Sequence, residues 1–302
     1  MSRPRVDTVR LTGAAATAIT ASALLAVIAL LAAQSIPAAR QGLLHFVSAN
    51  DWSYRAATFG AAAMIYGTVV VSAIALLLAA PLSFATAVFL SEICHRRLRM
   101  PLKAAIELLA GIPSVVYGLV GVLFLRDLMG AAFERLQWNA WQGDTLLTAG
   151  ILLAVMIVPT MTTLADDALR SVPARSRDAA RALGLTRAES VFSVVVPQAR
   201  SGLVAAVLLG LGRALGETIA VFLIVGRADN RLPESFAGAM RTLIEPGQTI
   251  TSKLGGAEPN IAAGDPLHGG AIALLALVLL SLVLLVTLAA DRLRTGTFAE
   301  EH

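Results

Sequence analysis

The sequence predicts an all-α integral membrane protein with six transmembrane helices. Hydrophobic residues make up 57% of the 302 positions, charged residues only 15%, and the mean hydropathy is +0.74. A soluble domain with a polar surface could hardly tolerate that balance. Six runs are long enough to cross a hydrocarbon core of about 30 Å, which needs roughly 20 apolar residues per helix. None of them alternates with period two, as the strands of a membrane barrel would.

The first apolar run, residues 11–33, follows Arg3, Arg5 and Arg10, a charged start that signal peptides share. Because the run exceeds the roughly 7 to 15 residues of a cleavable apolar region, we expect a retained anchor. The remaining spans are expected at residues 61–90, 102–125, 145–164, 201–225 and 269–290.

Basic residues stay on the cytoplasmic side of short loops and thereby set the orientation. If the N-terminal segment 1–10 is cytoplasmic, the segment 165–200 and the tail 291–302 are cytoplasmic too. The inner segments then carry most of the basic residues: Arg3, Arg5, Arg10, Arg96, Arg97, Arg99, Lys103, Arg170, Arg175, Arg177, Arg181, Arg187, Arg200, Arg292 and Arg294. The net charge of +4 follows from this topology and needs no nucleic-acid partner.

The polar segment 165–200 predicts two helices separated by a stop. Pro173 suits the first turn of a helix, and we expect that helix to run to about residue 183. Gly184 can take the left-handed conformation that ends it. Thr186 and Glu189 then predict a capping box for a second helix, which runs apolar until it meets Pro197.

This segment is interpreted as a docking site for another protein, because Ala179 and Ala180 are small enough for a partner to approach the backbone closely. A solvated loop without partners is the alternative. A DNA-binding helix-turn-helix is disfavoured, since arginines exceed acidic residues only modestly here and both ends are tethered in the membrane.

A partner would have to supply any ATP chemistry. The chain has only two lysines, Lys103 and Lys253, and neither follows a glycine, so it contains no phosphate-binding loop of the Gly-Lys-Ser/Thr type. ATP and Mg²⁺ are therefore expected in a separate subunit, and no cofactor is expected in this chain.

The fifth span places charge inside the membrane, at Arg213 and Glu217. Inserting an isolated arginine near the midplane of the membrane costs at least about 2.5 kcal/mol of free energy. An arginine at that depth is therefore a candidate functional residue by default. Being four residues apart, the two side chains are expected on one helix face. The alternative is a mutual ion pair that only locks helix packing. Three nearby glycines either permit close helix crossing or loosen the backbone: Gly210, Gly212 and Gly216.

The third span carries Pro113, which interrupts helical hydrogen bonding at a depth similar to that of Arg213. Ser114 and Tyr117 are three residues apart and are expected to face one way. The alternative is a simple proline kink whose hydroxyl is satisfied locally. At the membrane edge, Glu107 is expected to pair with Lys103.

An arginine fork fits an oxyanion such as phosphate, and hydroxyl groups can complete its shell. A neighbouring carboxylate would repel a fully deprotonated anion but could accept a hydrogen bond from a protonated one. Phosphate is protonated at neutral pH and sulfate is not, so the Arg213–Glu217 pattern favours phosphate.

Neither a metal site nor catalytic residues are predicted. Cys94 is the single cysteine, so no disulfide can form within the chain. It lies beside His95, but a metal site would need further ligands that the sequence does not place nearby. An intramembrane hydrolase would need a nucleophile and a base within the spans. All four histidines lie outside them: His45, His95, His268 and His302.

The segment 178–197 resembles the EAA motif of ABC importer permeases, which forms the coupling helices that dock in a cleft of the ATPase subunit. The residues in that register are Asp178, Ala179, Ala180, Gly184, Val194, Val196 and Pro197. Asp178 stands where the motif has Glu, and Val196 where it has Leu. The resemblance implies that this segment couples the chain to an ATPase.

Three further segments resemble the permeases of phosphate-specific bacterial ABC importers, of the C type: 112–118, 212–221 and 245–251. The resemblance spans about residues 47–290. It implies a six-helix type I (MetI-like) permease in the bacterial plasma membrane that passes inorganic phosphate inward. The implied partners are a paralogous A-type permease, a dimer of ATP-binding subunits and an extracytoplasmic phosphate-binding protein, besides membrane lipid.

The expected pathway residues are Arg213 and Glu217, with Ser114, Tyr117 and Thr218 as further candidates. Two alternative functions remain at this point. One is a permease of the same fold for another oxyanion, and the other is an ion-coupled secondary carrier, which would use the same buried Arg and Glu.

Overall fold

The computed structural model describes residues 4–138, 143–228, 232–233 and 235–296. Six of its helical units are long and apolar enough to cross a membrane, which confirms the predicted number of transmembrane helices. They comprise Arg10–Ala39, Ala62–Ile93, Ser114–Arg135, Leu146–Ser171, Arg187–Gly216 and Pro266–Leu288.

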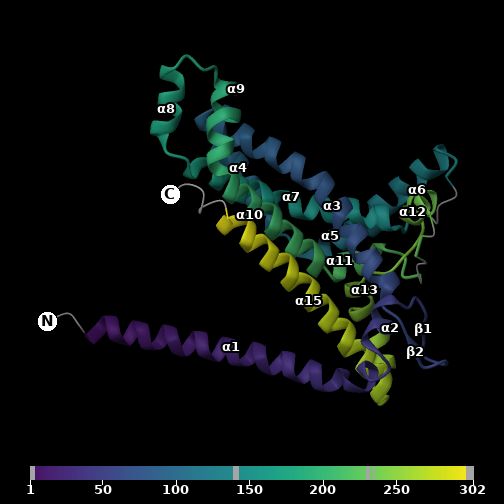
Figure 1. Cartoon of the computed structure of the whole chain (residues 1–302). Coiled ribbons are helices and arrows are strands. Elements are labelled where there is room, and N and C mark those ends of the chain that lie inside the picture. Colours follow the sequence, from purple (N-terminus) through teal and green to yellow (C-terminus); the bar gives the residue numbers. More distant parts are fainter. Residues whose placement is uncertain (1–3, 139–142, 229–231, 234, 297–302) are drawn as a thin grey trace.

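Helix α7 (Leu146–Ser171) is the centre of the bundle. Of its most apolar window, 67% is buried, against 28% or less for the other candidate spans. It packs against α3 (Ala62–Val88) and α10 (Val196–Gly216) around a core of aliphatic side chains. Helix α15 (Pro266–Gly296) packs on α10 and on α1 (Pro4–Ala39), which diverges from the other helices (Figure 1).

The two ends of the molecule carry different elements (Figure 1). The α8 end holds α8 (Ala174–Ala182), α9 (Arg187–Ser190), the start of α1 and the end of α15. The predicted termini lie partly outside the described residues, which exclude 1–3 and 297–302.

The opposite end, called the loop end below, holds the short connecting elements (Figure 1). Strands β1 (Trp52–Ser53) and β2 (Thr58–Phe59) pair antiparallel there, after α2 (Leu43–Ser48). The short helices at this end are α12 (Phe236–Leu243), α13 (Ile250–Leu254) and α14 (Glu258–Ile261).

The third span lies further along the chain than the predicted 102–125. Helix α4 (Arg96–Ala110) is a separate element, and none of its residues is fully buried. Residues 111–113, which follow it, are not helical and separate it from the next helix. Proline has no N–H to continue the helical ladder, so Pro113 ends one helix and precedes the next. The span itself consists of α5 (Ser114–Val120), the π-helical turn η2 (Gly121–Leu125) and α6 (Arg126–Arg135).

The fifth span begins earlier and ends earlier than the predicted 201–225. Helix α9 continues through the π-helical turn η3 (Val191–Val195) directly into α10, so Pro197 does not end the second helix of the polar segment. The α-helical pattern restarts after η3, and the missing N–H of Pro197 falls in a first turn. The helix is interrupted after Gly216, and α11 (Ile219–Ile224) begins two residues beyond this break.

Candidate functional site

Arg213 lies in the last turn of α10, directly before the break, and is half-buried. Its Nη1 donates a hydrogen bond of 3.0 Å to Oγ1 of Thr160 on α7. The expectation that Arg213 and Glu217 share one helix face is wrong, because the helix ends at Gly216 and Glu217 is extended. The alternative, a mutual ion pair, is not formed among the described residues either. Arg213 is held by a hydroxyl group, and its other guanidinium N–H donors have no hydrogen-bond partner in the described part of the chain.

Glu217 and Thr218 form the break between α10 and α11. Glu217 is extended, with φ −71° and ψ 119°, and its Oε1 accepts a 3.2 Å hydrogen bond from the backbone N–H of Ala220, which caps α11. The Thr218 hydroxyl donates to the Gly216 carbonyl at 3.3 Å. Among the described residues, Oε2 of Glu217 accepts no hydrogen bond, so one of its two carboxylate oxygens has no protein partner there.

The break in the third span lies beside the break in the fifth. A Cβ on Gly118 of α5 would come within 2.7 Å of Leu223 Cδ1 and 3.0 Å of the Ala220 Cα, so α5 and α11 are in close contact. The Tyr117 hydroxyl donates to the Leu109 carbonyl at 2.8 Å, which spans the gap between α4 and α5. Tyr117 also packs against the core cluster that contains Ala214 and Ala220, one on each side of the break in the fifth span.

The structure thus groups Arg213, Glu217, Thr218 and Tyr117 around two broken spans. Ser114 is the first residue of α5, one turn before Tyr117, and no hydrogen bond between described residues joins it to Arg213. Thr160 is a member of this group that the sequence analysis missed, because nothing in its sequence neighbourhood indicates that α7 faces Arg213. Broken membrane helices characteristically surround substrate sites in transporters.

The glycines near Arg213 differ in role. A Cβ on Gly210 would lie 2.6 Å from Sδ of Met161, so this glycine permits the close crossing of α7 and α10. A Cβ on Gly212 or Gly216 would meet nothing within 4 Å. Close packing therefore explains the first of the three glycines only.

The polar segment folds as predicted into a helix, a glycine stop and a capping box. Gly184 has φ +82°, and its N–H bonds to the Arg181 carbonyl at 2.9 Å while the Leu185 N–H bonds to the Ala180 carbonyl at 3.2 Å. These two bonds form the Schellman motif of a helix end. Thr186 and Glu189 form the reciprocal capping box.

The exposed face of α8 carries Asp178 and Ala179, whereas Ala180 is only 3% exposed and packs within the protein. The expectation that both alanines meet a partner is therefore wrong for Ala180, which faces the side of α8 opposite to Asp178. Leu183 is 81% exposed and extends the outward surface.

Arg177 fixes α8 to the bundle, a role that the sequence analysis did not predict. Its Nη2 lies 2.9 Å from Oε1 of Glu92, in the π-helical turn η1 (Phe89–Ile93) at the end of α3. The same guanidinium donates to the carbonyls of Val172 at 2.5 Å and Leu169 at 2.7 Å, at the end of α7. One side chain therefore ties α8 to the ends of α3 and α7.

A second ion cluster lies at the same end. Asp166 of α7 is fully buried and receives two hydrogen bonds from Arg99, at 2.8 and 3.1 Å, and one from Lys103 at 3.2 Å. Lys103 also binds Asp167 at 2.6 Å, and this hydrogen bond raises the pKa of Lys103 against the opposing effect of burial. The expected pair of Lys103 with Glu107 is thus replaced by contacts between α4 and α7.

The loop end holds a third cluster, centred on Glu258. Its Oε1 lies 2.8 Å from Nζ of Lys253, and its Oε2 lies 2.8 Å from Nε2 of His268 and 3.3 Å from the indole nitrogen of Trp52. Burial tends to raise the pKa of Glu258, but the ion pair and hydrogen bonds outweigh it and hold that pKa below its usual value. No sequence motif indicated this cluster.

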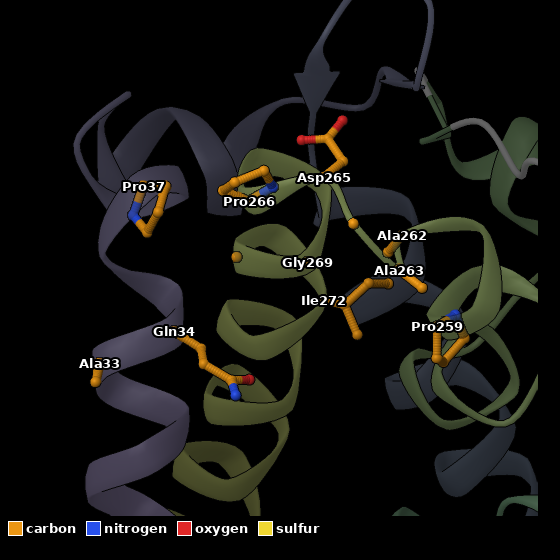
Figure 2. A pocket seen from close by; sticks show the side chains of 12 residues that line it. Ala33, Gln34, Pro37, Pro259, Ala262, Ala263, Asp265, Pro266, Gly269 and Ile272 are labelled. Carbon is orange, nitrogen blue, oxygen red and sulfur yellow. The ribbon is translucent and has the colours of Figure 1, made fainter.

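A cavity of about 640 Å³ lies between α1 and α15 near the loop end (Figure 2). Its lining residues are mostly small or apolar, and Figure 2 shows its one carboxylate, Asp265, at the rim. That carboxylate accepts hydrogen bonds from the N–H groups of Leu267 and His268. The lining includes no cation, so this cavity is not suited to an oxyanion.

Comparisons with known proteins agree with this architecture. Residues 79–297 match the family described as binding-protein-dependent transport system inner membrane component. The chain is 36% identical to the phosphate transport system permease protein PstC of Mesorhizobium japonicum, over 80% of this chain and 75% of that protein. It is 37% identical to the protein of the same name from Pasteurella multocida, over 82% and 78%.

Two solved structures share the fold. A chain of the MetNI methionine ABC transporter superimposes with a TM-score of 0.56 at 18% identity, covering 76% of this chain and 93% of that one. A chain of a bacterial ABC transporter for the acidic polysaccharide alginate gives 0.54 at 15% identity, covering 95% and 96%. The predicted ABC importer permease fold is thereby confirmed. Members of the matched family are multi-pass permeases, which are transport subunits and not enzymes and which work with an ATPase and a binding protein. The chain belongs to this family of binding-protein-dependent transport system inner membrane components.

Proposed function

We propose that the chain is the C-type permease subunit of an ATP-driven importer that moves inorganic phosphate into the cell. Relatives 36% and 37% identical are named as phosphate transport permeases. The observation that carries the proposal is the position of Arg213, half-buried beside two broken spans and held by a hydroxyl group. A guanidinium in that setting is a natural partner of a tetrahedral oxyanion.

The selectivity for phosphate is proposed to come from Glu217. With Oε1 engaged in capping α11, Oε2 can accept a hydrogen bond from a phosphate ion that keeps a proton at neutral pH. A fully deprotonated sulfate offers no such proton and would be repelled. Ser114, Tyr117 and Thr218 are proposed to complete the shell with hydroxyl groups.

The α8 end is proposed to be cytoplasmic, because most basic residues outside the spans then fall on the inner side. Asp178, Ala179 and Leu183 would contact a dimer of ATP-binding subunits, which holds ATP and Mg²⁺; this chain holds neither. Gly184 and Pro197 would contribute by shaping the hairpin. Closure of the ATPase would reach Arg213 through the continuous helix that begins at Arg187.

Two further proteins and membrane lipid complete the proposed importer. A paralogous A-type permease would close the pathway opposite Arg213, and membrane lipid would cover the remaining apolar faces. An extracytoplasmic phosphate-binding protein would deliver its ligand at the loop end. The site of action is then the bacterial plasma membrane.

The proposal is tested by reconstituting the permease pair, the ATPase and the binding protein in vesicles. We expect uptake of labelled phosphate with ATP but not with ADP, and only weak competition by sulfate. Glu217→Gln should lower the preference for phosphate over sulfate, whereas Glu134→Gln, an exposed carboxylate in α6, should leave it unchanged. ATP-independent uptake, or a preference unaffected by Glu217→Gln, would contradict the corresponding part of the proposal.

A further inference from the structure

A second cavity, of about 410 Å³, lies at the loop end and is called the loop-end pocket here. Phe222, Gly226 and Arg227 line one side of it, and residues of the segment 248–258 line the other. A water molecule occupies about 30 Å³ of liquid volume, so the pocket can admit a tetrahedral oxyanion together with several waters. Unlike the larger cavity between α1 and α15, its lining includes two cations, Arg227 and Lys253.

Arg227 is held in an unusual conformation at the rim of this pocket. Its φ is +54°, a region that residues other than glycine seldom adopt and that carries an energetic cost. Its backbone carbonyl accepts a 3.1 Å hydrogen bond from Nε2 of Gln248, and its guanidinium lies 5.0 Å from the Phe222 ring centroid. The surrounding residues therefore hold the backbone and the guanidinium of this exposed arginine beside the pocket.

Two cations and one carboxylate line the pocket, namely Arg227, Lys253 and Glu258. Lys253 is paired with Glu258, whose second oxygen is engaged by His268, whereas the guanidinium of Arg227 forms no ion pair among the described residues. A site on a transport pathway has to bind strongly enough to capture its ligand and weakly enough to release it, which this balance permits.

The pocket adjoins the break in the fifth span. A Cβ on Gly255 would contact Cγ2 of Thr218, and one on Gly256 would lie 3.1 Å from Phe222. Phe222 follows Thr218 by about one helical turn, or ~6 Å along α11. The turn at residues 255–256 therefore packs on both the break and the wall of the pocket.

We propose that the loop-end pocket is a second oxyanion-binding site, where inorganic phosphate is held by Arg227 and Lys253 before it passes to the break at Glu217. The inference rests on the proposed phosphate transport and adds a stage that precedes the Arg213 site. Phosphate ions and phospholipid headgroups share this chemistry, and the proposal commits to the free ion.

The test measures binding without transport. Cys94 is replaced by Ser and Ala257, an exposed residue of the pocket lining, by Cys. The complete transporter is reconstituted without ATP in phosphatidylcholine vesicles, and the rate of thiol modification by uncharged N-ethylmaleimide is followed. We expect inorganic phosphate to slow this rate in a saturable manner, compared with chloride at equal ionic strength. A cysteine replacing Ala56, exposed between β1 and β2, is the matched control and should not be protected.

Adding Arg227→Gln should raise the half-protecting phosphate concentration at least about tenfold, the loss expected for one charge-assisted hydrogen bond. Arg55→Gln removes the same charge from an exposed position at the same end and should have no effect. The inference is overturned if phosphate gives no protection, if protection survives Arg227→Gln, or if a parallel set of vesicles containing an anionic phospholipid shows protection without added phosphate. A wild-type transporter that shows no ATP-dependent phosphate uptake would instead contradict the proposed function, which is measured separately.

Discussion

The attachment of α8 by Arg177 gives a prediction whose size follows from the structure. Arg177→Met keeps the aliphatic stem but removes the guanidinium that binds Glu92 and two carbonyls at the end of α7. The side chains of Arg177 and Glu92 are 17% and 9% exposed, so solvent compensates little for the lost partner. Breaking such a pair costs about 3 to 5 kcal/mol, since it leaves a buried charge.

Because each ~1.4 kcal/mol is a factor of ten, detachment of α8 should become at least about 100-fold more frequent. Amide hydrogen exchange measures this directly in segment 174–185, which should lose protection by that factor while the α7 core keeps its own. Weakened docking of the ATPase should accompany the loss. Arg175→Met, an exposed change in the same helix, is the control and should alter exchange little.

A double variant separates the ion pair from general damage. Combining Arg177→Met with Glu92→Gln removes the buried charge as well, and should restore part of the lost protection. Unchanged exchange in the single variant, or a purely additive loss in the double one, would refute the reasoning.

Two further predictions concern packing and pH. Gly210→Leu should lower the thermal unfolding midpoint, because overpacking against Met161 should reduce the free energy of unfolding by about 1 to 3 kcal/mol. Gly212→Leu is the control and should be tolerated, since no atom lies within 4 Å of a Cβ at that position. Because the folded-state pKa of Glu258 lies below its usual 4.5, its contribution to stability should be complete above pH 4.5 and be lost as the pH falls through the folded-state pKa. The unfolding midpoint of Glu258→Gln should therefore approach that of the wild type only in acid.

Local chemistry allowed much of this architecture to be predicted. Apolar run length is enough to predict the number of spans, and the stop at Gly184 and the capping box at Thr186 depend on neighbouring residues only. The ends of the third and fifth spans were misplaced, because hydropathy does not detect a break inside an apolar run. The break after Gly216 is visible in the fold because α11 packs separately on α5.

Contacts between distant segments account for the missed residues. Thr160 of α7 accepts a hydrogen bond from Arg213 of α10, and Arg177 binds Glu92, which lies 85 positions away in the sequence. Lys253 was noted only as one of two lysines, although its contacts with Glu258 and the loop-end pocket explain its burial. Such pairings depend on how the helices pack, and single-sequence spacing carries no signal for them.

The most direct test of the account is ATP-dependent phosphate uptake by reconstituted vesicles that carry Arg213→Ala. With assembly of the complex verified, we predict a loss of uptake of at least about tenfold, because one charge-assisted contact to the ion is removed. The control Arg55→Ala should transport normally. Uptake retained in Arg213→Ala would contradict the assignment of Arg213 to the phosphate pathway.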